Sequence, residues 1–361
     1  MTEKRRVPGP ESRDPRPETR DPRPETRDSG LPEDKLRQQR LEKLGRIVSS
    51  GVDPWPARFD RSHSCAEALA AFREGEDVPV RLSGRLVAFR DLGKLTFAHL
   101  LDDGCRIQLS FQVNDLQEAY SRLKDLDVGD ILGVSGYLFK TNRGEITAHV
   151  QEFQLLAKSL RPLPEKWHGL TDIEKRYRQR YLDLIANEDA RETFRQRSGI
   201  VSGIRRFLDE RGFLEVETPI LQPLYGGAAA RPFVTHYHAL ERDFYLRISD
   251  ELYLKRLIIG GFNKVYEIGK DFRNEGIDAR HLQEFSMLEL YQAYADMEDI
   301  LRLTEELIHY LARDVLGVTV VRHGEHAIDF SKPFERLSIG EALLQWANID
   351  VERAGLEELA A

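Results

Sequence analysis

The stretch Phe272–Phe285 reads FRNEGIDARHLQEF, and it decides which fold this sequence predicts. It places two arginines, three acids, a histidine and two aromatic residues between two apolar segments. The preceding residues, KVYEIGKDFRNE, and the following residues, FSMLELY, both alternate between apolar and polar side chains as β-strands do. The sequence therefore predicts two strands joined by a charged loop.

One face of this predicted strand pair is polar and aromatic, because side chains two residues apart point the same way. The first strand contributes four charged residues to it: Glu267, Asp271, Arg273 and Glu275. The second strand contributes Phe285, Met287, Glu289 and Tyr291. Antiparallel pairing would bring both sets onto one surface.

Two interpretations of this surface are open. A solvated sheet face with cross-strand ion pairs would explain the charges but not the Phe and Met beside them. A nucleotide pocket explains both, with a base stacked on Phe285 and phosphates held by Arg273, Arg280 and His281. The sequence contains no glycine-rich phosphate loop, so such a site would lie on the sheet rather than at a helix N-terminus.

Composition sets broad limits. The 361 residues carry a net charge of −8 and are 41% hydrophobic, which suits two or three globular domains. No run approaches the roughly 20 apolar residues of a membrane span, and the N-terminus lacks an apolar signal-peptide core. We therefore expect a cytoplasmic protein with no membrane partner.

Cys65 and Cys105 lie far apart without metal-binding spacing, which predicts reduced thiols. The acidic total leaves room for a local basic face and an RNA partner.

The N-terminal third is expected to contain a tail and a helical region. Residues 1–33 are rich in Pro, Arg, Asp and Glu and repeat DPRPETR in tandem, which predicts a disordered low-complexity tail. Its role is open between an RNA-contacting extension and a dispensable leader. Residues 34–76 form an N-terminal helical region. Its first helix has apolar residues at Leu36, Leu41, Leu44 and Val48 and ends at Gly51.

Residues 77–160 are expected to form a small β-barrel. Five alternating runs begin at Val80, Lys94, Cys105, Ile131 and Glu145, with one helix at 114–126 before the fourth. Five strands and one helix in this order describe an OB-fold, which binds single-stranded nucleic acid on an outer face.

The remaining residues are expected to form a hinge and a second domain. Residues 161–190 have the composition of a hinge followed by a charged helix, and residues 191–361 form the second domain. In that domain a long helix ends at Gly212, and FLEVETP follows as a strand that stops at Pro219.

Taken together, these segments resemble a known family. The runs GFLEVETPIL, FRNEG and RHLQEFSMLELY resemble the first and second signature motifs of class II aminoacyl-tRNA synthetases. YGGAAARPFVTH and RISDELYLKRLIIGG resemble the lysyl branch. The similarity covers about Leu36 to Leu344. It implies an α+β fold: an N-terminal OB-fold β-barrel plus a partial class II aminoacyl-tRNA synthetase antiparallel sheet flanked by helices.

The resemblance implies a lysine–tRNA ligase. Such enzymes let the lysine carboxylate attack the α-phosphate of ATP and then transfer the lysyl group to tRNA-Lys. Because the protein supplies no covalent nucleophile, positioning and charge stabilisation perform the catalysis. By resemblance, Arg273 is the catalytic residue, contacting both the carboxylate and the α-phosphate. Glu275 meets the adenine amino group, His281 the outer phosphates and Phe285 the adenine ring.

The resemblance also assigns recognition residues. The lysine-binding set is Gly227, Glu251, Arg273, Glu289 and Tyr291, in which Glu289 and Tyr291 recognise the ε-ammonium, and Glu251 with the backbone near Gly227 holds the α-amino group. A buried ammonium needs such a carboxylate partner. The anticodon-binding set is Arg90, Phe97, Gln108 and Glu145 on the barrel. From their pattern alone, each of these could equally be an ordinary strand residue.

The family pattern is not followed throughout. The sequence reaches Ala361 before any counterpart of the third class II motif, whose residues hold Mg²⁺ and a second ATP-binding arginine. We therefore expect ATP and Mg²⁺ as cofactors but assign no metal ligand, and we expect a fragment with reduced activity. Leu282 and Gln283 replace the usual Asn and Pro. The helix and strand ending at Pro219 match the first motif, which predicts a homodimer.

Three alternatives remain open. A catalytically silent tRNA-binding or regulatory paralogue would lack the third motif but has no need of Arg273. A relative charging aspartate or asparagine would want a cation where Glu289 lies. An enzyme modifying protein lysines would lack the barrel.

Overall fold

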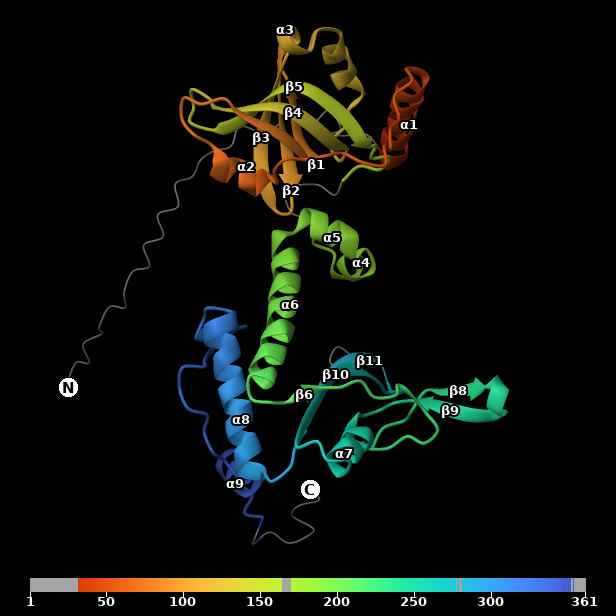
Figure 1. Ribbon diagram of the computed structural model, residues 1–361, viewed down its shortest axis with the longest axis vertical. Helices are drawn as coiled ribbons and strands as arrows, with labels where there is room; N and C mark the ends of the chain where they lie inside the picture. The colour runs from red at the N-terminus through yellow and green to blue at the C-terminus, as the bar shows by residue number, and fades with distance from the viewer. Residues whose placement is uncertain (1–31, 164–169, 277, 279–280, 352, 354–361) are drawn as a thin grey trace, which may run out of the picture. The chain divides into compact units, whose positions relative to one another are not determined.

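The computed structural model describes residues 32–163, 170–276, 278, 281–351 and 353 (Figure 1). The chain divides into two compact units, Met1–Ala190 and Arg191–Ala361. Almost all of the predicted tail, residues 1–33, and Arg280 lie outside the described residues. Within the described part, no helix is both long enough and apolar enough to span a bilayer.

A closed five-stranded barrel dominates the first unit (Figure 1). Its strands are β1 (Val78–Asp91), β2 (Leu95–Asp102), β3 (Cys105–Gln112), β4 (Ile131–Lys140) and β5 (Ile146–Ala157). They run in the order β1-β2-β3-β5-β4, with only the β3–β5 pair parallel among these neighbours. The OB-fold predicted from the sequence is confirmed.

The barrel closes because alternate side chains fill its interior. Leu82, Leu100, Leu109 and Leu132 are each 0% exposed and belong to one core cluster. Gly136 lies at a register shift between β4 and β5, where a Cβ would stand 1.8 Å from the His149 carbonyl oxygen. A side chain at this position would therefore force the two strands apart. The thiols of Cys65 and Cys105 are free, as predicted.

The predicted helix at 114–126 is not one α-helix. The structure has a short helix α3 (Val113–Leu116) followed by 3₁₀ turns, η1 (Gln117–Asp125). Gln117 has φ +49°, and an α-helix cannot continue through a positive φ. The Tyr120 hydroxyl, which donates to the Gly93 carbonyl at 2.8 Å, anchors the 3₁₀ turns to the barrel.

The first helix, α1 (Glu33–Ser49), forms as predicted, but its buried face differs in part from the predicted one, since Leu36 is buried and Leu41 and Leu44 are half-buried. The buried residues are Leu36, Arg40 and Ile47, whereas Val48 is 54% exposed. Arg40 is buried because its guanidinium donates to the carbonyls of residues 159, 161 and 128 at 3.0–3.2 Å. A charged side chain that finds this many acceptors can replace an apolar one on the buried face. Gly51, with φ +79°, follows the helix end as predicted.

Beneath α1, a buried lysine forms ion pairs with two aspartates of the turn that precedes β4. Lys158 is 5% exposed, and its Nζ donates to Asp130 at 2.8 Å and to Asp127 at 2.5 Å. The Asp130 carboxylate also accepts from the backbone N–H of Asp127 and of Ser159, each at 2.8 Å. This network fastens the end of β5 to the turn before β4.

Short helices complete the first unit. Helix α2 (Cys65–Ala71) begins with a capping box between Ser64 and Glu67. The charged helix expected within residues 161–190 is broken into α4 (Ile173–Arg178) and α5 (Arg180–Ala186). The break falls at Gln179, whose ψ of +57° is not helical.

The second unit is built on a three-stranded sheet in the order β11-β10-β6, flanked by helices (Figure 1). Its main elements are α6 (Glu188–Asp209), β6 (Leu214–Glu215), α7 (Glu251–Ile259), β10 (Lys264–Phe272), β11 (Glu284–Gln292) and α8 (Met297–Tyr310). A second sheet contains β7 (Leu221–Gln222), β8 (Val234–Tyr237) and β9 (Arg242–Leu246), with a 3₁₀ turn η2 (His238–Leu240). The chain continues through a π-helical turn η3 (Leu311–Val315), the hairpin β12 (Val320–His323) and β13 (His326–Asp329), and α9 (Ile339–Ala347).

One face of the β10–β11 pair is apolar. Phe207 and Leu208 of α6, Tyr266 of β10 and Leu307 of α8 form a buried cluster there. Ile268, Leu288 and Leu290 also pack against it. The opposite face is therefore left for polar residues.

The predicted strand FLEVETP is much shorter than expected. Only Leu214 and Glu215 join the sheet, in parallel with Val265 and Tyr266 of β10. Beyond them the Val216 N–H donates to the Tyr266 carbonyl at 2.9 Å, and the Thr218 hydroxyl donates to the Glu267 carboxylate at 2.7 Å. One backbone bond and one side-chain bond therefore replace a longer strand.

We expect Lys158→Ala to lower the free energy of unfolding by about 3–5 kcal/mol, because it leaves the buried Asp130 carboxylate without its cation, whereas Asp127 keeps Lys43. Urea denaturation of the 361-residue chain, followed by circular dichroism, measures this change.

Lys140→Ala is the matched control, since the Lys140 side chain is 44% exposed and lies 3.8 Å from Glu74. Its expected effect is below about 1 kcal/mol. Equal effects of the two substitutions would contradict a structural role for the buried cluster.

Candidate active site

The two predicted strands, β10 and β11, pair antiparallel as expected. Glu267 lies opposite Glu289, Asp271 opposite Phe285, and Val265 opposite Tyr291. Residues opposite each other in an antiparallel pair point to the same face. The prediction that these side chains share one surface is therefore confirmed.

Arg273 lies just past the end of β10. Its backbone N–H donates to the Gln283 carbonyl at 2.9 Å, which extends the strand pairing by one step. Its guanidinium Cζ lies 5.1 Å from the centre of the Phe285 ring. Nε and Nη2 both lie 3.4 Å from the Ile248 carbonyl oxygen. Arg273 and Phe285 are thus brought together.

Glu275 was predicted to lie on the strand face, and this prediction is wrong. Strand β10 ends at Phe272, and Glu275 is an exposed residue of the loop that follows. Glu275 is the third residue after the end of the strand, so strand alternation no longer fixes where its side chain points.

Glu289 is held by a serine from a different segment. The Ser249 hydroxyl donates to Glu289 Oε1 at 2.8 Å and also accepts from the Glu251 backbone N–H at 3.2 Å. Tyr291 is the next residue on this face of β11. Burial, with Glu289 and Glu251 nearby, raises the pKa of Tyr291 to about 12. The phenol is therefore a neutral hydroxyl beside a carboxylate at physiological pH.

Gly227 and Glu251 lie beside this pair. Gly227 has φ +88°, and a Cβ there would stand 2.8 Å from Ser249 Oγ and 3.0 Å from Glu251 Cβ. Only glycine allows this close approach of backbone to the site. Glu251 opens α7, and its carboxylate accepts from Lys255 at 2.7 Å. Four of the five predicted lysine-binding residues, Gly227, Glu251, Glu289 and Tyr291, therefore surround Ser249 and its neighbours.

Arg247 was missed by sequence reasoning, although it starts the run RISDELYLKR. It is 1% exposed, and Nη1 donates to Glu267 Oε1 at 2.6 Å. Nε donates to the Lys270 carbonyl at 2.9 Å, and Asp250 and Asp271 lie 2.9 and 3.3 Å from Nε. Gly269, midway between Glu267 and Asp271 in the sequence, was a second sign that a large side chain packs against β10. A Cβ there would lie 1.9 Å from Arg247 Nη2, so the glycine makes room for the guanidinium.

His281 lies in the exposed loop between the strands. Its Nδ1 pairs with Asp278 Oδ2 at 2.6 Å, and its backbone N–H donates to the same carboxylate at 2.8 Å. The side chain is 70% exposed. The structure does not join His281 to Arg273 or Phe285 by a described contact.

The predicted anticodon residues lie on one outer face of the barrel. Arg90 of β1 is opposite Phe97 of β2, and Phe97 is half-buried rather than part of the core. Gln108 Nε2 donates to Glu145 Oε2 at 2.6 Å. His99 was missed: it lies opposite Gln108 and pairs with Glu145 Oε1 at 3.2 Å. The alternation in LTFAHLL already placed it on the face of Phe97.

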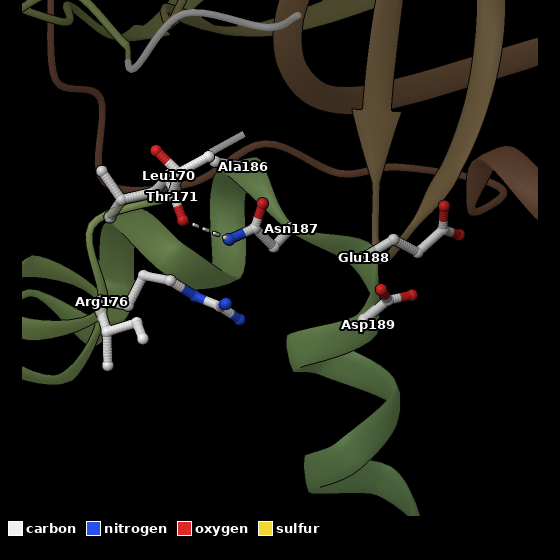
Figure 2. Close-up of a pocket in the computed structure, with 8 residues that line it drawn as sticks. Leu170, Thr171, Arg176, Ala186, Asn187, Glu188 and Asp189 are labelled. Carbon is white, nitrogen blue, oxygen red and sulfur yellow. Dashed lines mark hydrogen bonds between the residues drawn. The ribbon is translucent and has the colours of Figure 1, made fainter. Parts of the chain in front are cut away.

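A separate pocket lies where the first unit ends (Figure 2). Its lining includes Leu170, Thr171, Arg176 and Asn187. The Asn187 amide donates to the Leu170 carbonyl at 3.2 Å (Figure 2). It also donates to the Asp183 carboxylate at 2.6 Å, so Asn187 has a structural role. None of the predicted site residues lines this pocket.

The described residues do not fit a resident metal. Among them, no group of three or more His, Cys, Asp or Glu side chains is placed to hold a metal ion.

Comparison with known proteins agrees with this geometry. Residues 172–358 match the family model of tRNA synthetases class II (D, K and N), and residues 80–163 match the model of the OB-fold nucleic acid binding domain. The first match contains the whole β10–β11 site, and the second contains almost the whole barrel.

Relatives are similar over most of the chain. A lysine–tRNA ligase of Carboxydothermus hydrogenoformans is 51% identical over 318 residues, covering 88% of this chain and 65% of the relative. One from Dehalococcoides mccartyi is 51% identical over 327 residues, covering 89% of this chain and 66% of the relative. One from Clostridium botulinum is 50% identical over 319 residues, covering 88% and 63%. The chain thus spans about two thirds of the length of these curated relatives.

The family model covers more than half of the chain, and its match contains the strand pair on which Arg273, Phe285 and Glu289 converge. This chain belongs to the class II tRNA synthetases of the D, K and N group, with an OB-fold domain preceding the synthetase domain.

Proposed function

We propose that the chain carries the activity of a lysine–tRNA ligase, which activates L-lysine with ATP and transfers it to tRNA-Lys. The observation that carries this proposal is Glu289, an acceptor held by Ser249 at the polar face of the sheet beside Tyr291. The names of the relatives support the same substrate. A cytoplasmic location follows from this role in translation.

Lysine would bind with its ε-ammonium at Glu289. An ammonium removed from water is strongly destabilised unless a carboxylate pairs with it. Ser249 occupies Oε1 of Glu289, and a neutral Tyr291 hydroxyl adds an uncharged partner. The side chains of aspartate and asparagine offer no cation to this carboxylate. Glu251, next to the Gly227 backbone, would hold the α-amino group.

Arg273 would act as the catalytic residue. Its guanidinium lies over the Phe285 ring and makes long contacts, 3.4 Å, to the Ile248 carbonyl. It can therefore turn toward an anion without breaking a strong ion pair. When the lysine carboxylate attacks the α-phosphate, negative charge grows on the phosphoryl oxygens, where a fixed cation lowers the barrier.

ATP would lie on the same face with its adenine against Phe285. Glu275 would accept from the adenine amino group, and His281 would approach the outer phosphates. Both residues lie in the loop after β10. The family's Mg²⁺ would neutralise phosphate charge, and no ligand for it is assigned among the described residues.

The barrel would bind the anticodon of tRNA-Lys. Phe97 offers a stacking surface, and Arg90, Gln108 and Glu145 offer polar groups beside it. The region around β6, which matches the family's first motif, would form a homodimer interface.

The first test is lysine-dependent exchange of pyrophosphate into ATP by the purified 361-residue chain. Arg273→Ala should lower the rate about 10²–10³-fold, the usual effect of losing a donor to developing charge. Glu289→Gln should raise the lysine KM roughly 10- to 100-fold, because a charged hydrogen bond is lost.

Glu284→Gln is the matched control on the same strand, since Glu284 is exposed and lies 3.4 Å from Lys270. It should leave both kcat and KM unchanged. An absence of exchange by the wild-type chain would contradict the ligase proposal for these 361 residues and would favour a tRNA-binding protein without activation chemistry.

The second test concerns the barrel. Phe97→Ala should weaken tRNA-Lys binding by about 1–3 kcal/mol, or roughly 5- to 150-fold, through loss of one stacked base. Fluorescence anisotropy with a tRNA-Lys transcript measures this.

Trp55→Ala removes an aromatic side chain of the same unit that is 52% exposed and outside the β1–β3 face. It should not change the affinity. The barrel assignment fails if wild-type protein binds a transcript with an altered anticodon equally well.

A further inference from the structure

Two buried aspartates behind the candidate lysine pocket have charges that the structure does not balance. Asp250 and Asp271 are each 0% exposed. None of their four carboxylate oxygens accepts a hydrogen bond from a donor in the described part of the chain. Buried carboxylates normally have such partners, so this arrangement needs an explanation.

Arg247 is close to both aspartates but directs its hydrogen bonds elsewhere. Its Nε–H points at the Lys270 carbonyl at 2.9 Å, and Nη1 donates to Glu267 at 2.6 Å. Glu267 accepts further bonds from the Thr218 N–H at 3.1 Å and hydroxyl at 2.7 Å. Glu267 is therefore the satisfied carboxylate, whereas Asp250 and Asp271 have proximity to the cation alone, at 2.9 and 3.3 Å from Nε.

The charge balance of this cluster is negative. One buried guanidinium faces Asp250 next to α7 and both Glu267 and Asp271 on β10. Glu289 on β11 adds a further negative charge near the aspartates, and Arg273 adds a positive charge near Asp271. Two adjacent ionised carboxylates repel each other and can only offer acceptors. One proton between them removes the repulsion and creates the missing hydrogen bond.

We propose that Asp250 and Asp271 share one proton, and that this hydrogen-bonded carboxyl pair fixes the segment Arg247–Glu251 against β10. The two aspartates are positioning residues. Their segment carries Ser249, which holds Glu289, and the Ile248 carbonyl, which contacts Arg273. Loss of the proton would therefore weaken the positioning of Ser249 and of the Ile248 carbonyl.

The expected titration supports this pairing. Burial, together with the neighbouring Asp271, raises the pKa of Asp250 to about 8. Burial also raises the pKa of Asp271, against the opposing effect of Arg247. The folded chain therefore keeps a proton that the unfolded chain releases near an ordinary aspartate pKa of about 3.9. Between these two pKa values the unfolded state binds fewer protons, so stability falls as pH rises and levels off above the folded pKa.

The test compares the full 361-residue wild-type chain with Asp250→Asn and Asp271→Asn. An amide can donate to the remaining carboxylate permanently, as the shared proton does. Infrared spectroscopy of the wild type should show the carbonyl stretch of a protonated carboxyl group at pH 7 that disappears by pH 10, and each single variant should lack it. Urea unfolding from pH 6 to 9 should show a stability loss equivalent to about one proton in the wild type relative to either variant.

Glu325→Gln, an exposed acid-to-amide change in the turn between β12 and β13, is the control and should follow the wild type. Absence of the infrared band in the wild type overturns the proposal, even if a variant fails to fold. Identical pH slopes in wild type and Asp250→Asn overturn it as well.

The effect on the lysine pocket rests on the proposed function and needs its own measurement. The ratio of the lysine KM of the wild type to that of Asp250→Asn should rise at least about twofold from pH 7 to pH 9, the low end for groups coupled in one network. Taking the ratio cancels the titration of lysine itself. A constant ratio overturns the positioning role. If no protein shows exchange, the ligase proposal fails, while the infrared and unfolding results still decide whether the proton is shared.

Discussion

Arg247 places one positive charge, 1% exposed, between its own loop and strand β10, where its partner Glu267 lies 20 residues further along the sequence. A buried charge that loses its partner destabilises a fold strongly, so the loop and β10 must stay together. Gly269 permits this contact, because any Cβ would occupy the place of the guanidinium. The rest of the site follows from this constraint, since the residues after Arg247 reach the reactive face only while Arg247 is docked.

The order of residues in that loop explains how one short segment serves several tasks. Ile248 presents its carbonyl to Arg273, Ser249 presents its hydroxyl to Glu289, and Glu251 begins helix α7. Consecutive side chains in an irregular segment point in different directions, so each can meet a different wall of the pocket. The apolar face of the same sheet packs on α6 and α8 and holds β10 and β11 in place. Packing on one face thus supports chemistry on the other.

The sequence predicted the structure correctly where the two-residue alternation of side chains along a strand determines it. Alternation over two residues predicted all five barrel strands and the shared face of Phe285 and Glu289, because the pleat leaves one choice of face. It failed where a long-range partner decides. Arg40 is buried because carbonyls from the end of β5 accept from it, and the break at Gln117 depends on a backbone angle. Arg247 was missed for the same reason, since two of the three carboxylates around it, Glu267 and Asp271, come from strand β10.

A pocket for an ammonium group must satisfy two opposing requirements. It needs carboxylates, because a cation taken out of water has to be paired, yet carboxylates gathered in a buried place repel each other and weaken the fold. In this structure Glu289 faces the pocket and is held by a neutral hydroxyl, whereas Asp250 and Asp271 stand behind it with Arg247. With the proposed proton between the two aspartates, the site keeps a negative electrostatic potential toward its ligand, and the buried residues behind it carry less negative charge. The acidic surroundings that we propose to bind lysine therefore also account for the carboxyl pair that we propose behind them.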